Sequence, residues 1–169
     1  YDGLGISING HKDITIKNCN THKYYYAIHA RNSENIVIRD NNLCCNKAHK
    51  TDSIKTEDNQ LWPRTTPDIR KDSGVREYGG GLYLLESKKL IVSNNILNDQ
   101  QNGIDMFNVD YAIIEKNKIS TQDAHNWGLG IRLSDSSSNI IRDNTINHVD
   151  RNCEGQGNRD ICKKGGFSD

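Results

Sequence analysis

The sequence lacks an excess of charge, long hydrophobic runs and an initial methionine. Its 22 basic residues balance 22 acidic ones with no long block of either sign, so its bulk charge attracts neither nucleic acid nor an anionic membrane. No apolar run approaches the roughly 20 residues that span a bilayer. We therefore expect no nucleic-acid binding and no membrane insertion. Because the chain starts at Tyr1 without a signal peptide, we expect a processed form or a fragment.

Two residue types dominate a chain that has the length of one domain. Its 169 residues include 21 Asn and 20 Ile, but only two Pro. Asn favours turns over helices and β-branched Ile favours strands, so this pairing argues against a helical bundle. Only 34% of the residues are hydrophobic, and the mean hydropathy is −0.80, which is low for a globular core. The regular recurrence of Ile nevertheless argues against disorder.

An Ile-x-x-Asn-x-(Ile/Leu) motif recurs along the chain. A degenerate copy carries Cys19 in place of the Asn. A second motif, a small residue followed by apolar-x-apolar, precedes every copy. The copies of the first motif are Ile16…Cys19…Thr21, Ile38…Asn41…Leu43, Ile91…Asn94…Ile96, Ile114…Asn117…Ile119 and Ile141…Asn144…Ile146. The copies of the second start at Gly5, Ala27, Gly81, Gly103 and Gly130.

The spacing of the two motifs predicts a solenoid. From the first apolar residue of the second motif to the Ile of the first, the gap is 10, 10, 9, 10 and 10 residues. The minimal period of about 22 residues is too short to bury an apolar face alone, so successive units must stack. Stacked parallel strands put equivalent residues in register about 4.8 Å apart, so the repeated Asn can form a ladder of side-chain amides. An antiparallel sandwich predicts no such Asn.

The pattern resembles the right-handed parallel β-helix repeat. This repeat is shared by pectate lyases, by alginate lyases and C5-epimerases, and by the periplasmic copper-site maturation protein of nitrous oxide reductase. The resemblance extends from Gly3 to about Asn147. It implies an all-β fold, a right-handed parallel β-helix of about five coils, and a single domain over residues 1–169. Long insertions are expected at one corner, over residues 44–80, 120–128 and 147–166.

The x position of the second motif points outward and forms a column beside these insertions. Elimination or epimerisation of a uronate requires a neutralised carboxylate, a base for the C5 proton and a proton donor. His29 or Tyr83 can act as base or acid. Arg132 and Arg31 can neutralise the carboxylate, and Asp105 can orient a partner or hold a cation. The bland alternative is that Asp105 and Arg132 form only a surface ion pair. The predicted catalytic residues are His29, Tyr83, Asp105 and Arg132.

Aromatic residues of the insertions are candidates for sugar stacking. Trp127 and His125 lie in a short insertion, and Tyr78 lies at the edge of the longest one. Trp62 can instead anchor its own insertion of 37 residues. A second outward column lies two residues along from the first and comprises Asn9, Arg31, Leu85, Phe107 and Ser134. The predicted substrate-binding residues are Arg31, Trp62, Tyr78, Phe107, His125 and Trp127.

No histidine or acidic spacing defines a metal site, and we assign no metal ligands. His22 and His49 follow equivalent strands of neighbouring coils, which hints weakly at copper or zinc. Calcium is an open alternative, through Asp58, Asp68, Asp72 or Asp123. Five cysteines allow a Cys153–Cys162 bridge and one pair among Cys19, Cys44 and Cys45, and such bridges favour an oxidising compartment.

The functional hypothesis is a carbohydrate-active protein, secreted, periplasmic or at the cell surface, whose partner is a polysaccharide. It acts as a lyase or C5-epimerase on a uronate-containing polymer. The alternative is a non-catalytic module of a cell-surface, phage-tail or periplasmic protein that binds glycan or protein. A third alternative is copper delivery, as the resemblance to the maturation protein suggests. Whether the chain is an enzyme stays open at this point.

Overall fold

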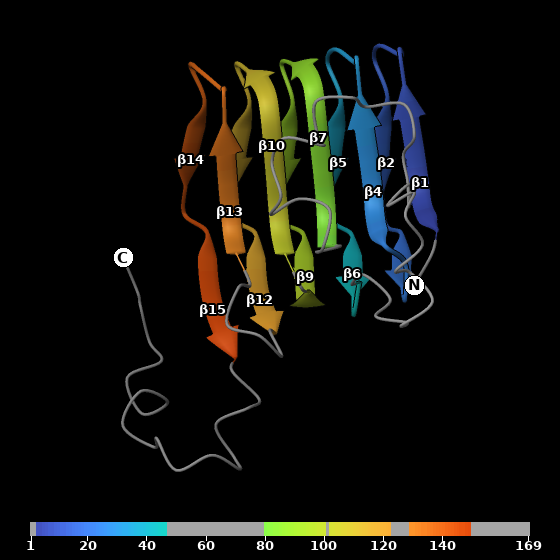
Figure 1. The fold of residues 1–169 in the computed structure, drawn as a ribbon, viewed down its shortest axis with the longest axis vertical. Helices are drawn as coiled ribbons and strands as arrows, with labels where there is room; N and C mark the ends of the chain where they lie inside the picture. Colours follow the sequence, from blue (N-terminus) through green and yellow to red (C-terminus); the bar gives the residue numbers. More distant parts are fainter. Residues whose placement is uncertain (1–2, 47–79, 101, 123–128, 150–169) are drawn as a thin grey trace, which may run out of the picture.

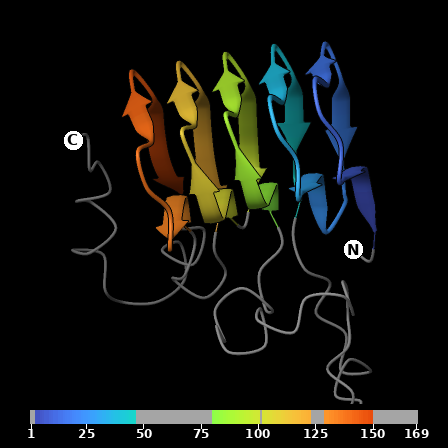
Figure 2. The same ribbon diagram turned by 90° about the horizontal axis from the view of Figure 1, so that it is seen from above.

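The structure is a computed structural model that describes residues 3–46, 80–100, 102–122 and 129–149. These residues form 15 strands in three parallel sheets of five strands each, and no helix. The chain visits the three sheets in turn, and each circuit makes one coil on top of the last (Figures 1 and 2). The fold is a right-handed parallel β-helix of about five coils, as the repeat predicted.

The sheets, named A, B and C in the order that the chain reaches them, each take one strand from every coil. Sheet A contains β1 (Leu4–Asn9), β4 (Tyr26–Arg31), β7 (Gly80–Lys88), β10 (Asn102–Asp110) and β13 (Leu129–Ser134). Sheet B contains β2 (Thr15–Lys17), β5 (Val37–Arg39), β8 (Ile91–Ser93), β11 (Ile113–Glu115) and β14 (Ile140–Arg142). Sheet C contains β3 (Asn20–His22), β6 (Asn42–Cys44), β9 (Ile96–Gln100), β12 (Lys118–Gln122) and β15 (Thr145–Val149).

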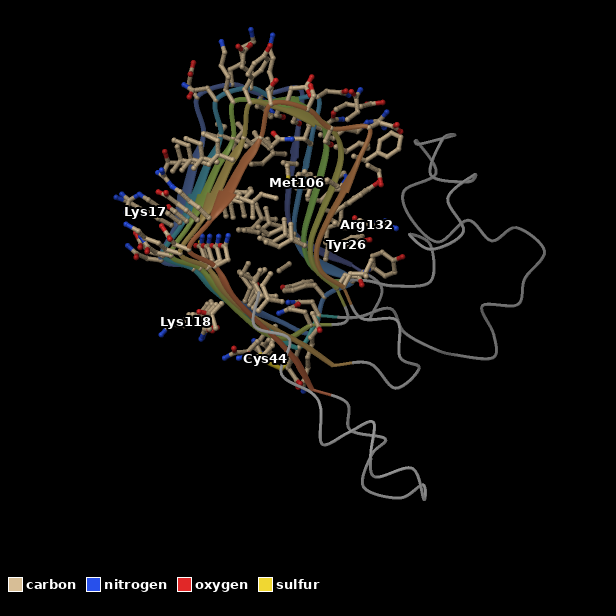
Figure 3. The ribbon with its side chains drawn as sticks, turned by 90° about the vertical axis from the view of Figure 1, so that its left-hand side faces the viewer. Lys17, Tyr26, Cys44, Met106, Lys118 and Arg132 are labelled. Atoms are coloured by element: carbon tan, nitrogen blue, oxygen red, sulfur yellow. A yellow bond between two sulfur atoms is a disulfide. The ribbon has the colours of Figure 1, made fainter. Side chains whose placement is uncertain are left out.

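The interior is filled by the alternate side chains of every strand. On sheet A, Ile28, Leu82 and Ile104 lie in register and are at most 1% exposed. Met106 occupies the same interior (Figure 3). Each coil contributes only a few inward residues, so a thin apolar filling is enough. This explains how a chain of low mean hydropathy forms a buried core.

The third coil departs from the predicted register by one residue. The sequence motif placed Ile91 inward and Asn94 in the ladder, but Val92 pairs with Ile38 and Ile114 and is fully buried. Ile91 faces outward and is 37% exposed. With Val92 as the inward residue the gap from Leu82 is 10 residues, as in the other coils. The anomalous gap of nine was therefore the signal of the error.

The true ladder residue of the third coil is Asn95. The Asn41 amide donates to Oδ1 of Asn95 (2.9 Å), the Asn95 amide donates to Asn117 (3.0 Å), and Asn117 donates to Asn144 (3.0 Å). Each amide also donates to a backbone carbonyl in the sheet B strand of the preceding coil, as Asn95 does to Ile38 (2.9 Å). Asn95 and Asn117 are fully buried. The ladder satisfies polar groups that water cannot reach.

Asn94 belongs to a second kind of repeated position, a turn residue in the left-handed region. It is exposed, with φ of 54°. Asn and Asp tolerate this conformation better than other residues with a Cβ. The chain uses this turn in every coil, so the excess of Asn serves turns as well as the ladder. The equivalent residues are Asn18, Asp40, Lys116 and Asp143, with φ between 55° and 56°.

The small residue of the second motif lies where sheets A and C converge. A Cβ at Gly103 would overlap the carbonyl oxygen of Gly130 and the Ile119 side chain of the same coil. Gly81 meets Leu97 in the same way. The interior is too narrow at this corner for a side chain from both sheets. The small residue is therefore a steric requirement of the coil.

Two more ladders occupy other corners of the coil. Ser87 Oγ accepts from the backbone N–H of Ser33 (3.1 Å), and Ser33 Oγ accepts from that of His11 (3.3 Å). At the corner after sheet C, the Asn46 amide donates to Gln100 Oε1 (3.1 Å). All three bonds join neighbouring coils, so they stabilise the stack in the same way as the Asn ladder.

Candidate functional site on the outer face of sheet A

The four residues that the sequence predicted to be catalytic lie in one row on the outer face of sheet A. Backbone pairing places His29 beside Tyr83, Tyr83 beside Asp105, and Asp105 beside Arg132, one residue per coil. Ser7 of β1 is the neighbour of His29 at the other end. Figure 3 shows Tyr26 and Arg132 on this face, on the side of the coil away from Lys17 of sheet B.

Most of the column is buried although it points outward. His29 is 5% exposed, Tyr83 1% and Asp105 2%, whereas the Arg132 side chain keeps 21% of its surface. Alternation along the strands predicts that these residues point outward, but it does not predict their burial.

Asp105 and Arg132 form a two-pronged ion pair across neighbouring coils. Arg132 Nε donates to Asp105 Oδ1 (2.6 Å), and Nη2 donates to Oδ2 (2.9 Å). This fork matches the geometry of a carboxylate. Because the Asp105 side chain is only 2% exposed, the pair is not the exposed surface ion pair of the structural alternative, and the guanidinium helps to compensate the charge of a buried carboxylate.

An aromatic cluster lies beside this pair. The Tyr26 and Tyr83 rings stack with centroids 5.1 Å apart, and Tyr25 meets Tyr26 edge-on at 4.8 Å. Tyr25, Tyr26, Tyr83 and Leu85 form an apolar cluster separate from the interior core, with Phe107 packed against it. Part of the outer face of sheet A is therefore apolar as well as the inner face, unlike a sheet whose outer face is wholly polar.

Burial raises the pKa of Tyr26 well above its ordinary value, and nearby Tyr25 and Asp105 raise it further. The Tyr26 phenol is thus protonated at neutral pH and is a hydrogen-bond donor. The sequence motifs had not selected Tyr26. The signal available was the Tyr24-Tyr25-Tyr26 run directly before a small-residue motif.

His29 differs from its neighbours in having no hydrogen-bond partner in the described part of the chain. Both Nδ1 and Nε2 are buried and unpaired. The ring stacks on Tyr83, with centroids 5.5 Å apart. Burial lowers the pKa of His29 to about 4, and the positive charge of Arg31 contributes. The imidazole is therefore neutral at neutral pH.

The second column brings Arg31 and Phe107 to the same face. Backbone pairing places Leu85 between them in the third coil. Arg31 Nε donates to Glu86 (3.1 Å), and the Arg31 side chain is 17% exposed. Both arginines predicted to neutralise a substrate carboxylate therefore already pair with a carboxylate of the chain. Sequence reasoning missed Glu86, which sits in a left-handed turn with φ of 48°.

Several predicted residues lie outside the described part of the chain. They are Trp62, Tyr78, His125 and Trp127, the calcium candidates Asp58, Asp68, Asp72 and Asp123, and His49, Cys153 and Cys162. Within the described ranges no group of three or more His, Cys, Asp or Glu side chains is arranged to hold a metal ion. Cys44 and Cys45 form a disulfide, and Cys19 is free. Strands β12 and β15 run to Gln122 and Val149, further than the expected starts of the insertions.

The coil, the ladders and the outer face of sheet A define a protein of the parallel β-helix class. The family described as "Right handed beta helix region" matches residues 4–159, and the chain belongs to this family. Comparison with curated proteins and with solved structures finds no match. None of the described residues forms a helix long and apolar enough for a membrane crossing.

Proposed function

We propose that this β-helix protein acts on a uronate-containing polysaccharide at the outer face of sheet A, by lyase or C5-epimerase chemistry. The observation that carries the proposal is the in-register row from His29 to Arg132, which combines a neutral imidazole, a phenol and an ion pair. The spacing of about 4.8 Å between coils resembles the length of one sugar unit in an extended chain. A row with one residue per coil suits such a polymer.

The chemistry assigns a role to each group. Arg132 and Arg31 retain some exposure and would exchange their present carboxylates for that of the substrate. In one route His29 would take the C5 proton while the Tyr83 phenol gives its proton to the leaving oxygen; in the other the Tyr83 phenolate would take the C5 proton and pass it to the leaving oxygen. The Cys44–Cys45 disulfide supports the proposed secreted, periplasmic or cell-surface location, because disulfides persist in oxidising compartments.

A second candidate function is a non-catalytic glycan-binding module, and one observation favours it. Arg31 and Arg132 are both paired within the chain, so a substrate carboxylate must compete with Glu86 or Asp105. The base and the phenol are also buried. In such a module the exposed parts of the face bind sugar and no bond is broken.

One assay series separates the two candidates. The protein is incubated with polygalacturonate and with alginate, with and without calcium, and unsaturated uronate is followed by its ultraviolet absorbance. C5 inversion is followed by proton NMR. Tyr83→Phe keeps the buried ring and is expected to abolish turnover. Binding without turnover assigns the module, and neither binding nor turnover on any uronate polymer by the folded protein rejects both.

A further inference from the structure

The His29 imidazole is left uncompensated by the described part of the chain. Neither of its ring nitrogens has a hydrogen-bond partner there, although both are buried. Buried polar groups are almost always hydrogen-bonded, because burial removes their water. Two buried ring nitrogens that the described residues leave unpaired, on the face that carries the candidate site, are available to a ligand that binds this face.

Polar side chains of neighbouring positions on the outer face of sheet A lie around His29. On sheet A its neighbour in the first coil is Ser7, which is exposed, and its neighbour in the third coil is Tyr83, on which it stacks. Arg31 lies two residues along β4 on the same face and is 17% exposed. Asn9 pairs with Arg31 in the first coil and is also exposed.

The protonation state of His29 determines which chemical groups can bond both of its ring nitrogens. Burial holds the pKa near 4, so the ring carries one N–H donor and one acceptor nitrogen at neutral pH. A hydroxyl group both donates and accepts, and neighbouring hydroxyls of a sugar can satisfy both ring nitrogens. A carboxylate can only accept and an ammonium can only donate, so either leaves one nitrogen unpaired. The same low pKa makes His29 a weak base for removing a C5 proton near pH 7.

We propose that His29, Ser7 and Arg31 form a sugar-binding subsite at the first two coils, in which His29 bonds the hydroxyls of a uronate unit and Arg31 its carboxylate. The subsite rests on the proposed function and changes the role of His29 from base to binding residue. Turnover is then centred on the third to fifth coils, where Tyr83, Asp105 and Arg132 lie.

The test measures binding of tetragalacturonate and of a tetraguluronate by calorimetry. His29→Phe keeps a ring to stack on Tyr83 and removes both nitrogens, and we expect at least about tenfold weaker binding. His29→Gln retains a donor and an acceptor and is expected to recover part of the loss. His22→Gln, at an exposed histidine on the outer face of sheet C, is the control and should bind as the parent protein does. Circular dichroism checks that every variant is folded.

Nitrogen NMR of the histidine rings gives the second measurement. His29 is assigned from the signals that disappear in His29→Phe, and we expect its ring signals alone to move with sugar. If the parent protein binds a tetrasaccharide but His29→Phe binds equally well, the subsite is rejected and the proposed function stands. Ring signals unchanged by sugar also reject it. If the parent protein binds no uronate, both proposals fall.

Discussion

Arg132 in the fifth coil and Asp105 in the fourth are joined by two hydrogen bonds of 2.6 and 2.9 Å, although 27 residues separate them in the chain. The carboxylate is 2% exposed and the guanidinium side chain 21% exposed. The pair thus has two roles. It compensates a buried charge, and it lies in the row that we propose contacts the substrate. The two roles can be separated experimentally.

Arg132→Ala should lower the free energy of unfolding by about 3 kcal/mol, because it leaves the Asp105 carboxylate buried without its partner. Adding Asp105→Asn removes the uncompensated charge and should recover most of this loss. The measurement is urea unfolding of the single and double variants. If the pair is also functional, the double variant regains stability but not uronate binding or turnover. A loss below about 1 kcal/mol in Arg132→Ala would contradict the structural role.

Because only Asn95 belongs to the ladder, we expect substitutions at the adjacent Asn94 and Asn95 to differ sharply in their effect on the free energy of unfolding. Asn95→Ala removes the acceptor of two bonds from Asn41 and the side-chain donor to the Ile38 carbonyl, so we expect a loss of roughly 3 kcal/mol in unfolding free energy. Asn94→Gly replaces an exposed left-handed turn residue and should change stability by less than about 0.5 kcal/mol.

Asn144→Ala tests the same ladder at its far end and is expected to be milder than Asn95→Ala, because Asn144 is only partly buried. Thermal and urea unfolding of the three variants provide the comparison. Equal losses at Asn94 and Asn95 would show that the ladder bonds do not stabilise the stack.

Thr21 carries an unsatisfied hydroxyl in the interior. It occupies the position taken by Leu43 in the next coil, is 8% exposed, and its Oγ1 has no partner in the described residues. Thr21→Val keeps the shape and removes the unpaired group, so we expect a gain of about 1 kcal/mol in unfolding free energy. Thr121→Val is the matched control, since Thr121 is also buried, at 1% exposed, but has an interaction partner. It should be neutral or destabilising, and a destabilised Thr21→Val would refute the idea.

The lowered pKa of His29 predicts that the free energy of unfolding decreases in acid. Its pKa falls from 6.5 in the unfolded chain to about 4 when folded, so between these values the unfolded chain binds more protons. Its contribution to stability is complete above pH 6.5 and declines as the pH falls toward 4. We expect a loss of about 1.5 kcal/mol between pH 6.5 and pH 5.

Urea midpoints measured across this range in the parent protein and in His29→Phe provide the check. The slope between pH 6.5 and pH 5 should be reduced in His29→Phe, whereas His22→Gln should leave it intact. An unchanged slope in His29→Phe would mean that the imidazole remains charged in the folded protein.

The period of the sequence was enough to predict most of the fold. Gly103 illustrates the reason, because a Cβ at this position would overlap a side chain of the same coil, and the same kind of steric restriction recurs from coil to coil. The misplacement of Asn94 shows the limit of the method. Two consecutive asparagines suit two different positions, a left-handed turn and a ladder, and the pairing of Val92 with Ile38 assigns each asparagine to its position.

The sequence predicted that the residues of the candidate site form a column, but it did not predict what surrounds each of them. The alternation of one strand places His29 and Tyr83 on the outer face, and equal spacing aligns them. Their burial, the Tyr26 stack and the bond between Arg31 and Glu86, 55 residues apart, depend on which side chains neighbouring coils bring together.

The sequence by itself therefore determined the coil, the small-residue column and most of the ladder, because each follows from residues that repeat at a fixed spacing. Only the tertiary structure decided which outward side chains are buried, which charges are paired and that the His29 nitrogens have no partner in the described chain. These properties arise between neighbouring coils, where insertions of different length set which residues meet, and no local pattern encodes them.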